Sequence, residues 1–155
     1  MELVGKKAPA FTLRDTDEKN VSLKDYLGKW VVIYFYPKDN TPGCTVEACE
    51  FTDEFAGFEK IGATVLGVSK DSSASHQKFR EKYNLKVRLL SDPDAHMMEN
   101  YGAWGKKMLY GRMFNGVKRS TVIIDPSGKV VHWWKAVKAK GHAALVKKKL
   151  LELQG

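Results

Sequence analysis

The sequence has little cysteine, no long apolar run and no closely spaced histidines. Two cysteines among 155 residues are too few for the disulfide framework of a small secreted domain. No apolar segment approaches the roughly 20 residues that a membrane helix needs, so we expect a soluble protein. The N-terminal segment also lacks the apolar stretch and the cleavage pattern of a secretory signal, so we expect cytoplasmic residence.

The scarcity of histidine bears on metal binding. Structural zinc needs three or four ligands at recurrent short spacings. The histidines of this chain are instead dispersed, at His76, His96, His132 and His142. We therefore expect no metal site, and we interpret the histidines as surface residues or as buried residues with hydrogen-bond partners.

Acidic residues are outnumbered, since 26 Lys and Arg face 18 Asp and Glu and leave a formal charge of +8. We interpret this excess as scattered over most of the chain, with one dense run at Lys147–Lys149. That run fits the solvated side of a helix whose apolar stripe is formed by Ala143, Val146, Leu150 and Leu153. We expect neither a nucleic acid nor a membrane as partner, but a basic nucleic-acid-binding protein with incidental cysteines stays as an alternative.

Apolar patterning predicts a central β-sheet covered by helices on both faces. Residues 30–36, WVVIYFY, form the continuous apolar run typical of a strand buried on both sides, and residues 63–69, ATVLGVS, have the same character. A helix is expected between them, with an apolar face formed by Val46, Cys49, Phe55 and Phe58. The order strand, helix, strand predicts parallel pairing through a right-handed crossover.

Turn chemistry predicts two hairpins. Residues 11–23 alternate apolar and polar side chains around a polar centre, DTDEKN, and the turn DPSGK at residues 125–129 separates two further apolar runs. Residues 102–119 have no clear assignment.

The remaining elements are a short strand, VRLLS at residues 87–91, and helices. Asp71 or Ser72 is a suitable N-cap for one of them, Pro93 suits the start of another, and a last helix follows Gly141. Because no repeat, low-complexity tract or linker divides the chain, we expect residues 1–155 to form one domain.

The stretch YPKDNTPGCTVEACEF contains both cysteines. Thr41 is a good N-cap and Pro42 suits the first helical position, so Cys44 falls in the first turn of a helix. Unpaired backbone N–H groups and the positive end of the helix dipole favour a thiolate there. The dipole contributes only about 0.3 to 1 kcal/mol, so we expect a cationic neighbour, such as an arginine, to assist it.

Cys49 follows Cys44 by five residues. In a continuous helix that spacing separates the two Cα atoms by about 8.7 Å, whereas a disulfide needs them within about 7 Å. A bridge between them would therefore require the helix to unwind locally. The alternative, that both cysteines are small apolar core residues, stays open and is more serious for Cys49 than for Cys44.

The pattern Pro37-x-x-x-Thr41-x-x-Cys44 matches the active-site signature of the peroxiredoxins, and the stretch with its second cysteine at Cys49 resembles the peroxiredoxin Q or bacterioferritin comigratory protein subfamily. The likeness runs nearly full length, with further landmarks in GKKAPAFTL, WGKKMLYGRMFNGVKRSTVIIDPSGKV and KAKGH. It implies a thioredoxin-like α/β fold, with a central mixed β-sheet and helices on both faces.

The resemblance also implies roles for particular residues. Cys44 would be the peroxidatic nucleophile and Cys49 the resolving thiol. Arg119, which precedes the run STVIID, matches the active-site arginine of the family and would supply the cation. Without the resemblance, we would interpret Arg119 as a surface charge.

Three further residues match family positions. Thr41 would hold the peroxide and the thiolate through its hydroxyl, and Pro37 would shield the pocket from water. Glu47 matches a residue common after the peroxidatic cysteine, but an acidic side chain in a first helical turn is stabilising in any case. We therefore leave Glu47 out of the predicted catalytic set.

The implied function is that of a thioredoxin-dependent peroxidase, an atypical 2-Cys peroxiredoxin acting on hydrogen peroxide and organic hydroperoxides. Cys44 would be oxidised to a sulfenic acid, Cys49 would condense with it, and a thioredoxin-type dithiol would reduce the disulfide. The resemblance implies a monomer, because the resolving cysteine lies in the same chain, and no metal, haem or flavin. A thioredoxin-like protein disulfide oxidoreductase is the nearest alternative, although such proteins usually present Cys-x-x-Cys.

Overall fold

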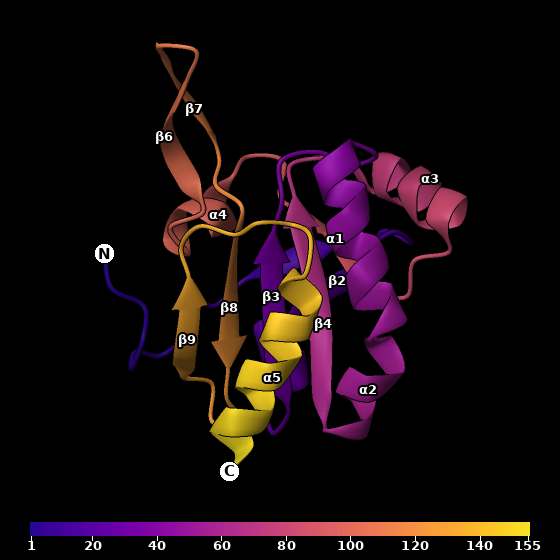
Figure 1. Ribbon diagram of the computed structural model, residues 1–155, viewed down its shortest axis with the longest axis vertical. Coiled ribbons are helices and arrows are strands. Elements are labelled where there is room, and N and C mark those ends of the chain that lie inside the picture. The colour runs from indigo at the N-terminus through magenta and orange to yellow at the C-terminus, as the bar shows by residue number, and fades with distance from the viewer.

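The computed structural model describes residues 1–155 and contains two sheets of very different size. In chain order the elements are β1 (Thr12–Arg14), β2 (Asn20–Ser22), η1 (Leu23–Tyr26), β3 (Trp30–Phe35), α1 (Pro42–Asp53), α2 (Phe55–Lys60), β4 (Ala63–Ser69), α3 (Ser73–Tyr83), β5 (Arg88–Ser91), α4 (His96–Asn100), β6 (Trp104–Leu109), β7 (Arg112–Val117), β8 (Ser120–Ile124), β9 (Val130–Trp134) and α5 (His142–Gln154). The large sheet has the strand order β2-β1-β5-β4-β3-β8-β9, and β6 and β7 form the small one (Figure 1). None of the helices has the length and apolar character that crossing a membrane requires.

The parallel crossover predicted at the centre of the sheet is confirmed. β3 and β4 pair in parallel, from Trp30 opposite Ala63 to Phe35 opposite Val68, and α1 and α2 connect them. Because side chains alternate across a strand, the odd-numbered residues from Val31 face one apolar core and the even-numbered residues face a second. Burial on both sides explains why the sequence of β3 is apolar throughout.

Helices cover both faces of the large sheet, as predicted (Figure 1). On one face α1, α3 and α5 contribute Phe51, Phe79 and Val146 to the core. On the other face α4 contributes Met97 and Met98, which pack with the N-terminal segment. The mixed sheet therefore lies between two apolar layers.

Both predicted hairpins are confirmed, since β1 pairs with β2 and β8 pairs with β9, each in antiparallel orientation. In the second hairpin the Asp125 carboxylate accepts the backbone N–H groups of Ser127 and Lys129, which closes the DPSGK turn. The N-cap of α3 is Ser72, whose hydroxyl accepts the N–H of Ser75.

The C-terminal helix also follows the prediction. Its apolar stripe is buried at Ala143, Val146 and Leu150, with Leu153 packed beside the core. The run of three lysines lies on the outer side, where Lys147 pairs with Glu54 at 3.1 Å and Lys149 with Glu152 at 3.7 Å. The run is therefore a solvated helix face.

The face predicted for the helix after β3 was wrong. The chain breaks at Glu54 into α1 and α2, so residues before and after the break do not share one helical face. Val46 is exposed. The residues of α1 that are buried are Cys44, Glu47, Ala48 and Phe51. The buried face of α1 therefore includes the polar residue Glu47, which the pattern of apolar residues does not predict.

The start of α4 was also predicted wrongly. The helix begins at His96 rather than at Pro93, and it is preceded by Ala95 in the left-handed conformation (φ 61°). Residues 92–95 form a turn in which the N–H of Ala95 donates to the carbonyl oxygen of Asp92. The Asp92 carboxylate accepts two N–H groups from the first turn of α4, so it performs the capping.

Residues 102–119, which had no assignment, contain the antiparallel pair β6 and β7. The hairpin projects from the body of the protein (Figure 1). Most of its side chains are exposed or half-buried, and Val117 is its one buried residue. Because neither face of the ribbon is covered, its sequence lacks the apolar alternation from which strands are predicted.

Candidate active site

Cys44 lies in the first turn of α1, as predicted. Thr41 is the N-cap residue with an extended backbone (φ −98°, ψ 156°), and Pro42 follows at the first helical position. Cys44 is 1% exposed, Cys49 is half-buried, and both are free thiols. The sulfur of Cys44 therefore sits where the unpaired N–H groups and the dipole of α1 favour an anion.

The expected cationic neighbour of Cys44 is Arg119, 75 residues further along the chain. Its Nη2 donates to Cys44 Sγ at 3.1 Å, and its Nη1 donates to Glu47 Oε1 at 2.6 Å. Burial lowers the pKa of Arg119, but Glu47 and Cys44 raise it by more, so the pKa lies above its ordinary value. The charged guanidinium thus contacts a thiol with one arm and a carboxylate with the other.

Glu47 is the site residue that sequence reasoning left out. Its side chain is fully buried, with Oε1 bonded to Arg119 and Oε2 without a partner. Burial raises the pKa of Glu47 to about 7, although Arg119 opposes the shift. The sequence offered one signal for Glu47, its match to a family position. That match was set aside because an acidic side chain in a first helical turn is stabilising in any case. Glu47 orients the guanidinium, because the bond to Nη1 leaves Nη2 directed at the sulfur.

Glu47 is expected to make the stability of the fold depend on pH. Its pKa is raised from 4.5 to about 7, so the folded state holds the proton more tightly than the unfolded chain does. The free energy of unfolding therefore falls as pH rises from about 4.5 to about 7, by about 3 kcal/mol from this group. Glu47→Gln cannot titrate, and urea unfolding at pH 5 and pH 8 should show a smaller loss in the variant. An equal loss in both proteins would contradict the assignment.

Gly43 lets Arg119 approach the helix closely. A Cβ atom at position 43 would lie 3.2 Å from Arg119 Nη2 and 4.0 Å from the Cβ of Ala139. The first distance is tighter than an ordinary contact, so a side chain here would displace the guanidinium from Cys44. The backbone carbonyl oxygen of Arg119 accepts the N–H of Val137 at 3.1 Å. The loop that contains the KAKGH landmark therefore helps to position the arginine.

Thr41 and Pro37 differ in how closely they follow the prediction. Thr41 occupies the N-cap position, but its side chain makes no capping bond and its hydroxyl donates instead to the carbonyl oxygen of Lys38 at 2.9 Å. With its hydrogen committed, the hydroxyl oxygen keeps lone pairs that can accept a hydrogen bond. Pro37 is exposed two residues after the end of β3, and its role as a shield stays a prediction.

His142 is a buried histidine near the site. His142 Nε2 is 2.8 Å from Thr121 Oγ1, and the ring stacks edge-on against Phe51 and Trp134. Burial, together with a smaller effect of the nearby charge of Arg119, lowers the pKa of His142 to about 4. The ring is therefore neutral at physiological pH and adds no second cation beside Arg119.

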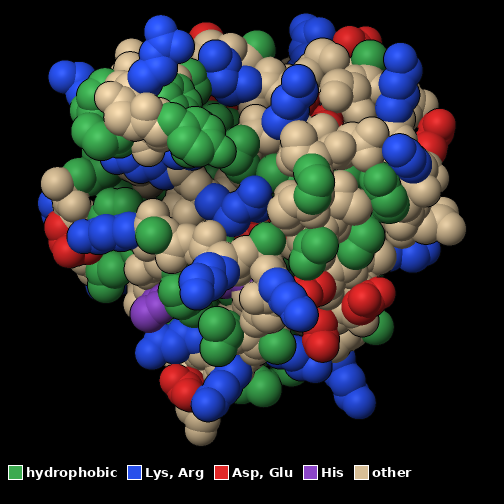
Figure 2. Space-filling view, turned by 45° about the horizontal axis from the view of Figure 1, so that its top comes forward, with side chains coloured by type: hydrophobic (Ala, Val, Ile, Leu, Met, Phe, Trp, Pro, Cys, Tyr) green, Lys and Arg blue, Asp and Glu red, His purple; other side chains and the backbone are tan.

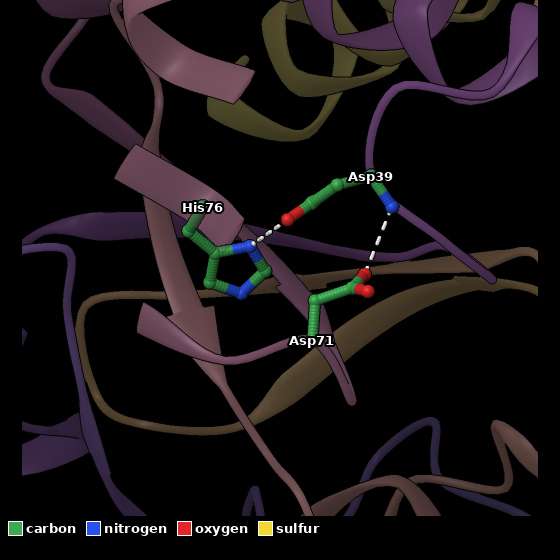
Figure 3. Close-up of side chains that lie close together, drawn as sticks. All are labelled: Asp39, Asp71 and His76. Carbon is green, nitrogen blue, oxygen red and sulfur yellow. Dashed lines mark hydrogen bonds and ion pairs between the residues drawn. The ribbon is translucent and has the colours of Figure 1, made fainter. Parts of the chain in front are cut away.

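A buried polar network supports the loop between β3 and α1 (Figure 3). The Asp39 carboxylate accepts three hydrogen bonds, from Tyr36 Oη at 2.6 Å, Ser75 Oγ at 2.8 Å and His76 Nδ1 at 2.7 Å. The backbone N–H of Asp39 donates to Asp71 Oδ2 at 2.8 Å. His76 is fully buried, and its Nε2 lies 2.9 Å from the carbonyl oxygen of Leu90. These contacts fix residue 39 to the β4–α3 connection and to α3.

The same network contains the side chains with the geometry closest to a metal-ligand set. The ligand atoms of Asp39, Asp71 and His76 lie within 4.8 Å of one another. Each of these side chains is already engaged in the hydrogen bonds described above, and Asp71 Oδ2 also accepts from Ser69 Oγ at 2.7 Å. The network is thus a structural support for the active-site loop, and the prediction that buried histidines have partners is confirmed for His76 and His142.

Cys49 is held apart from Cys44 by the continuity of α1, which runs from Pro42 to Asp53. Helical geometry separates the two Cα atoms by about 8.7 Å, beyond the reach of a disulfide. Burial raises the pKa of Cys49, and the Asp53 carboxylate raises it further. In this conformation Cys49 is therefore a protonated, distant thiol.

Comparison with known proteins agrees with the geometry. The model of the AhpC/TSA family matches residues 4–133. Peroxiredoxin Bcp of Bacillus subtilis is 44% identical, with 91% of this chain and 90% of that protein covered. Peroxiredoxin Bcp of Escherichia coli is 41% identical, with 92% and 91% covered.

A solved structure of the Xanthomonas campestris bacterioferritin comigratory protein superposes with a TM-score of 0.91 at 37% identity, covering 100% of this chain and 98% of that one. The predicted thioredoxin-like fold, with a central mixed sheet and helices on both faces, is thereby confirmed. The chain belongs to the AhpC/TSA family and, within it, to the Bcp and peroxiredoxin Q type of thiol-dependent peroxidase.

Proposed function

We propose that residues 1–155 form one domain that reduces hydroperoxides at Cys44 through an intramolecular disulfide with Cys49. The observation that carries the proposal is the 3.1 Å contact between Arg119 Nη2 and Cys44 Sγ at the start of α1. A cation at hydrogen-bond distance stabilises the thiolate, which is the nucleophilic form of cysteine. Glu47 supports the proposal because it holds the other arm of the same guanidinium.

In the first step the Cys44 thiolate attacks one oxygen of the hydroperoxide. The S–O bond forms as the O–O bond breaks, the leaving oxygen takes up a proton to give water or an alcohol, and Cys44 becomes a sulfenic acid. Arg119 and the free N–H groups of the first turn stabilise the charge that develops on the leaving oxygen. The Thr41 hydroxyl donates its hydrogen to the backbone carbonyl oxygen of Lys38. Its oxygen accepts a hydrogen bond from the peroxide and so aligns the peroxide with the sulfur. Pro37 limits the access of water.

In the second step the Cys49 thiol condenses with the sulfenic acid and releases water. The separation of the two cysteines along α1 requires the helix to unwind between them. Burial and Asp53 raise the pKa of Cys49 in the folded helix, so release from that environment also favours its thiolate. Unwinding thus brings the resolving sulfur within reach and activates it at the same moment.

The disulfide is returned to two thiols by a dithiol reductant through thiol–disulfide exchange. We assign this role to a thioredoxin-type protein, and we assign to the enzyme a monomeric state in the cytoplasm. The Xanthomonas campestris relative is described in connection with alkyl peroxide reduction. By similarity, we include organic hydroperoxides with hydrogen peroxide among the substrates.

The Cys49→Ser variant tests the proposed sequence of steps. After one equivalent of hydrogen peroxide, dimedone should label Cys44 in this variant, because the sulfenic acid has no resolving thiol. The unaltered chain should instead show a Cys44–Cys49 disulfide by peptide mass mapping and little adduct. Cys44→Ser serves as the control for labelling elsewhere. A Cys49→Ser protein that consumes peroxide without forming an adduct on Cys44 would rule out the sulfenic acid route.

A further inference from the structure

The positive charge of this chain is concentrated in its last third. Residues 101–155 contain twelve Lys and Arg but two Asp and Glu, whereas residues 1–100 contain fourteen and sixteen. The interpretation of the excess as scattered was therefore wrong, because the first 100 residues carry a net charge of −2 and the last 55 carry +10. The β6–β7 hairpin lies in this cationic part and carries Lys106, Lys107 and Arg112 with no acidic residue.

The end of the hairpin exposes apolar side chains. We call the following residues the hairpin tip: Met108, Leu109, Tyr110, Met113 and Phe114. All five are exposed, and Tyr110, at 94%, is the most exposed large apolar residue of the chain. Figure 2 shows apolar side chains gathered at the upper left with Lys and Arg around them. Because Met108 pairs with Met113 and Leu109 with Arg112, both faces of the ribbon carry apolar groups into solvent.

Tyr110 occupies a backbone position that does not suit a tyrosine. Tyr110 (φ 52°) and Gly111 (φ 76°) form the two-residue turn that connects Leu109 to Arg112. The first position of such a turn favours Asn, Asp or Gly, and a positive φ is unfavourable for a bulky side chain. Tyr110 therefore neither suits the turn nor packs against the rest of the protein.

We propose that the hairpin tip docks on an anionic lipid surface. Its apolar side chains would enter the boundary between headgroups and acyl chains, where a tyrosine ring is favoured. Lys106, which is exposed and lies farther from the turn, would be at the level of the negatively charged headgroups. Arg112 is exposed beside the turn, and its long side chain would extend back to the same level. The combination of an apolar end with cations and no acidic residue matches the two layers of such a surface.

Other occupants fit the hairpin less well. A second copy of the chain would bring two cationic hairpins and two net charges of +8 together. A nucleic acid would attract Lys106 and Arg112 but would offer no apolar layer for Met108 and Leu109. The proposal revises the expectation from the sequence that no membrane surface is a partner.

Docking would orient the catalytic site. Arg119 follows β7 by two residues, and Figure 1 shows the hairpin and the first turn of α1 at the same end of the molecule. The end that carries Cys44 would therefore face the lipid surface. Docking itself does not depend on peroxidase activity, so failure of one proposal would leave the other standing.

Vesicle co-sedimentation of the full chain tests the docking. The chain is expected to bind vesicles of phosphatidylcholine that contain one quarter phosphatidylglycerol. This binding should weaken as the salt concentration rises, and vesicles of phosphatidylcholine alone should not bind the chain. Tyr110→Asn suits the turn better and should weaken binding about tenfold through the lost apolar group. Arg112→Gln should weaken it about fivefold. The matched controls are Leu145→Ser and Lys148→Gln, which remove an exposed apolar group and an exposed charge from α5 and should bind as the unaltered chain does.

Several outcomes would overturn the docking proposal. These are no binding of the unaltered chain to anionic vesicles, equal binding to neutral ones, or equal losses in the hairpin and α5 variants. A dimer detected by analytical ultracentrifugation, or retention of an oligonucleotide, that requires Tyr110 in the absence of vesicle binding would assign the hairpin tip to that other occupant. Hydrogen peroxide consumption without lipid should be unchanged in Tyr110→Asn, which shows that the variant is folded.

Discussion

Cys44→Ser is expected to reduce hydroperoxide consumption to the background rate. A serine hydroxyl stays protonated near neutral pH, and Arg119 would then face a neutral oxygen in place of the sulfur it contacts at 3.1 Å. Neither the S–O bond nor the later disulfide can form. The measurement is peroxide loss with dithiothreitol as reductant, followed in parallel with the unaltered chain.

Cys49→Ser is the matched control for this experiment, because it makes the same chemical change five residues away in the same helix. With dithiothreitol present it should retain turnover, since a small thiol can reduce the sulfenic acid directly. Thiol-dependent turnover in Cys44→Ser would remove the nucleophile from the mechanism. Matching denaturation curves for the two variants would exclude unfolding as the cause of the loss.

Arg119→Gln is expected to lower kcat/KM for hydrogen peroxide by about 10² to 10³, the range found when one donor to a developing oxyanion is removed. The amide carries no charge to stabilise the thiolate or the leaving oxygen. It also leaves Glu47 buried without its cation. The variant should therefore lose more stability between pH 5, where the Glu47 carboxyl is protonated, and pH 8 than the unaltered chain does.

Two further variants separate the site from general charge effects. Lys118→Gln removes an exposed cation next to Arg119 in sequence and should change kcat/KM little. Adding Glu47→Gln to Arg119→Gln should recover stability at pH 8 without recovering activity, because the unpaired carboxylate is gone but the cation is still missing. If Arg119→Gln retained the activity of Lys118→Gln, the guanidinium would have no catalytic role.

The sequence specified the elements whose cause is local or fully apolar. β3 was predictable because both of its faces are buried, and the β8–β9 hairpin because Asp125 closes its turn with its own neighbours. The β6–β7 hairpin was missed for the opposite reason, since no core face imposes a period on it. The buried face of α1 was missed because contacts with distant elements decide it, and those contacts bury Glu47 beside apolar residues.

The candidate site divides in the same way. Thr41, Pro42 and Cys44 are neighbours in sequence, so the position of the thiol at a helix start followed from capping preferences. Arg119 lies 75 residues from Cys44, and its place in the site came from family resemblance rather than from the residues themselves. Glu47 matters through Arg119, so its importance appears only when the long-range contact is known.

The buried polar network around Asp39 limits how far the unwinding of α1 can extend toward β3. The side chains that bind Asp39 come from Tyr36 directly after β3, from the β4–α3 connection and from α3, and none comes from α1 itself. In the proposed unwinding, the first turns of α1 melt to join the two sulfurs, and residue 39 stays fixed just upstream of the N-cap. Nucleation is the costly step of helix formation. Because the residue just before the N-cap stays in place, the first turns of α1 re-form more quickly. The fixed loop thus lets the enzyme reset its nucleophile after each cycle without searching for the starting geometry again.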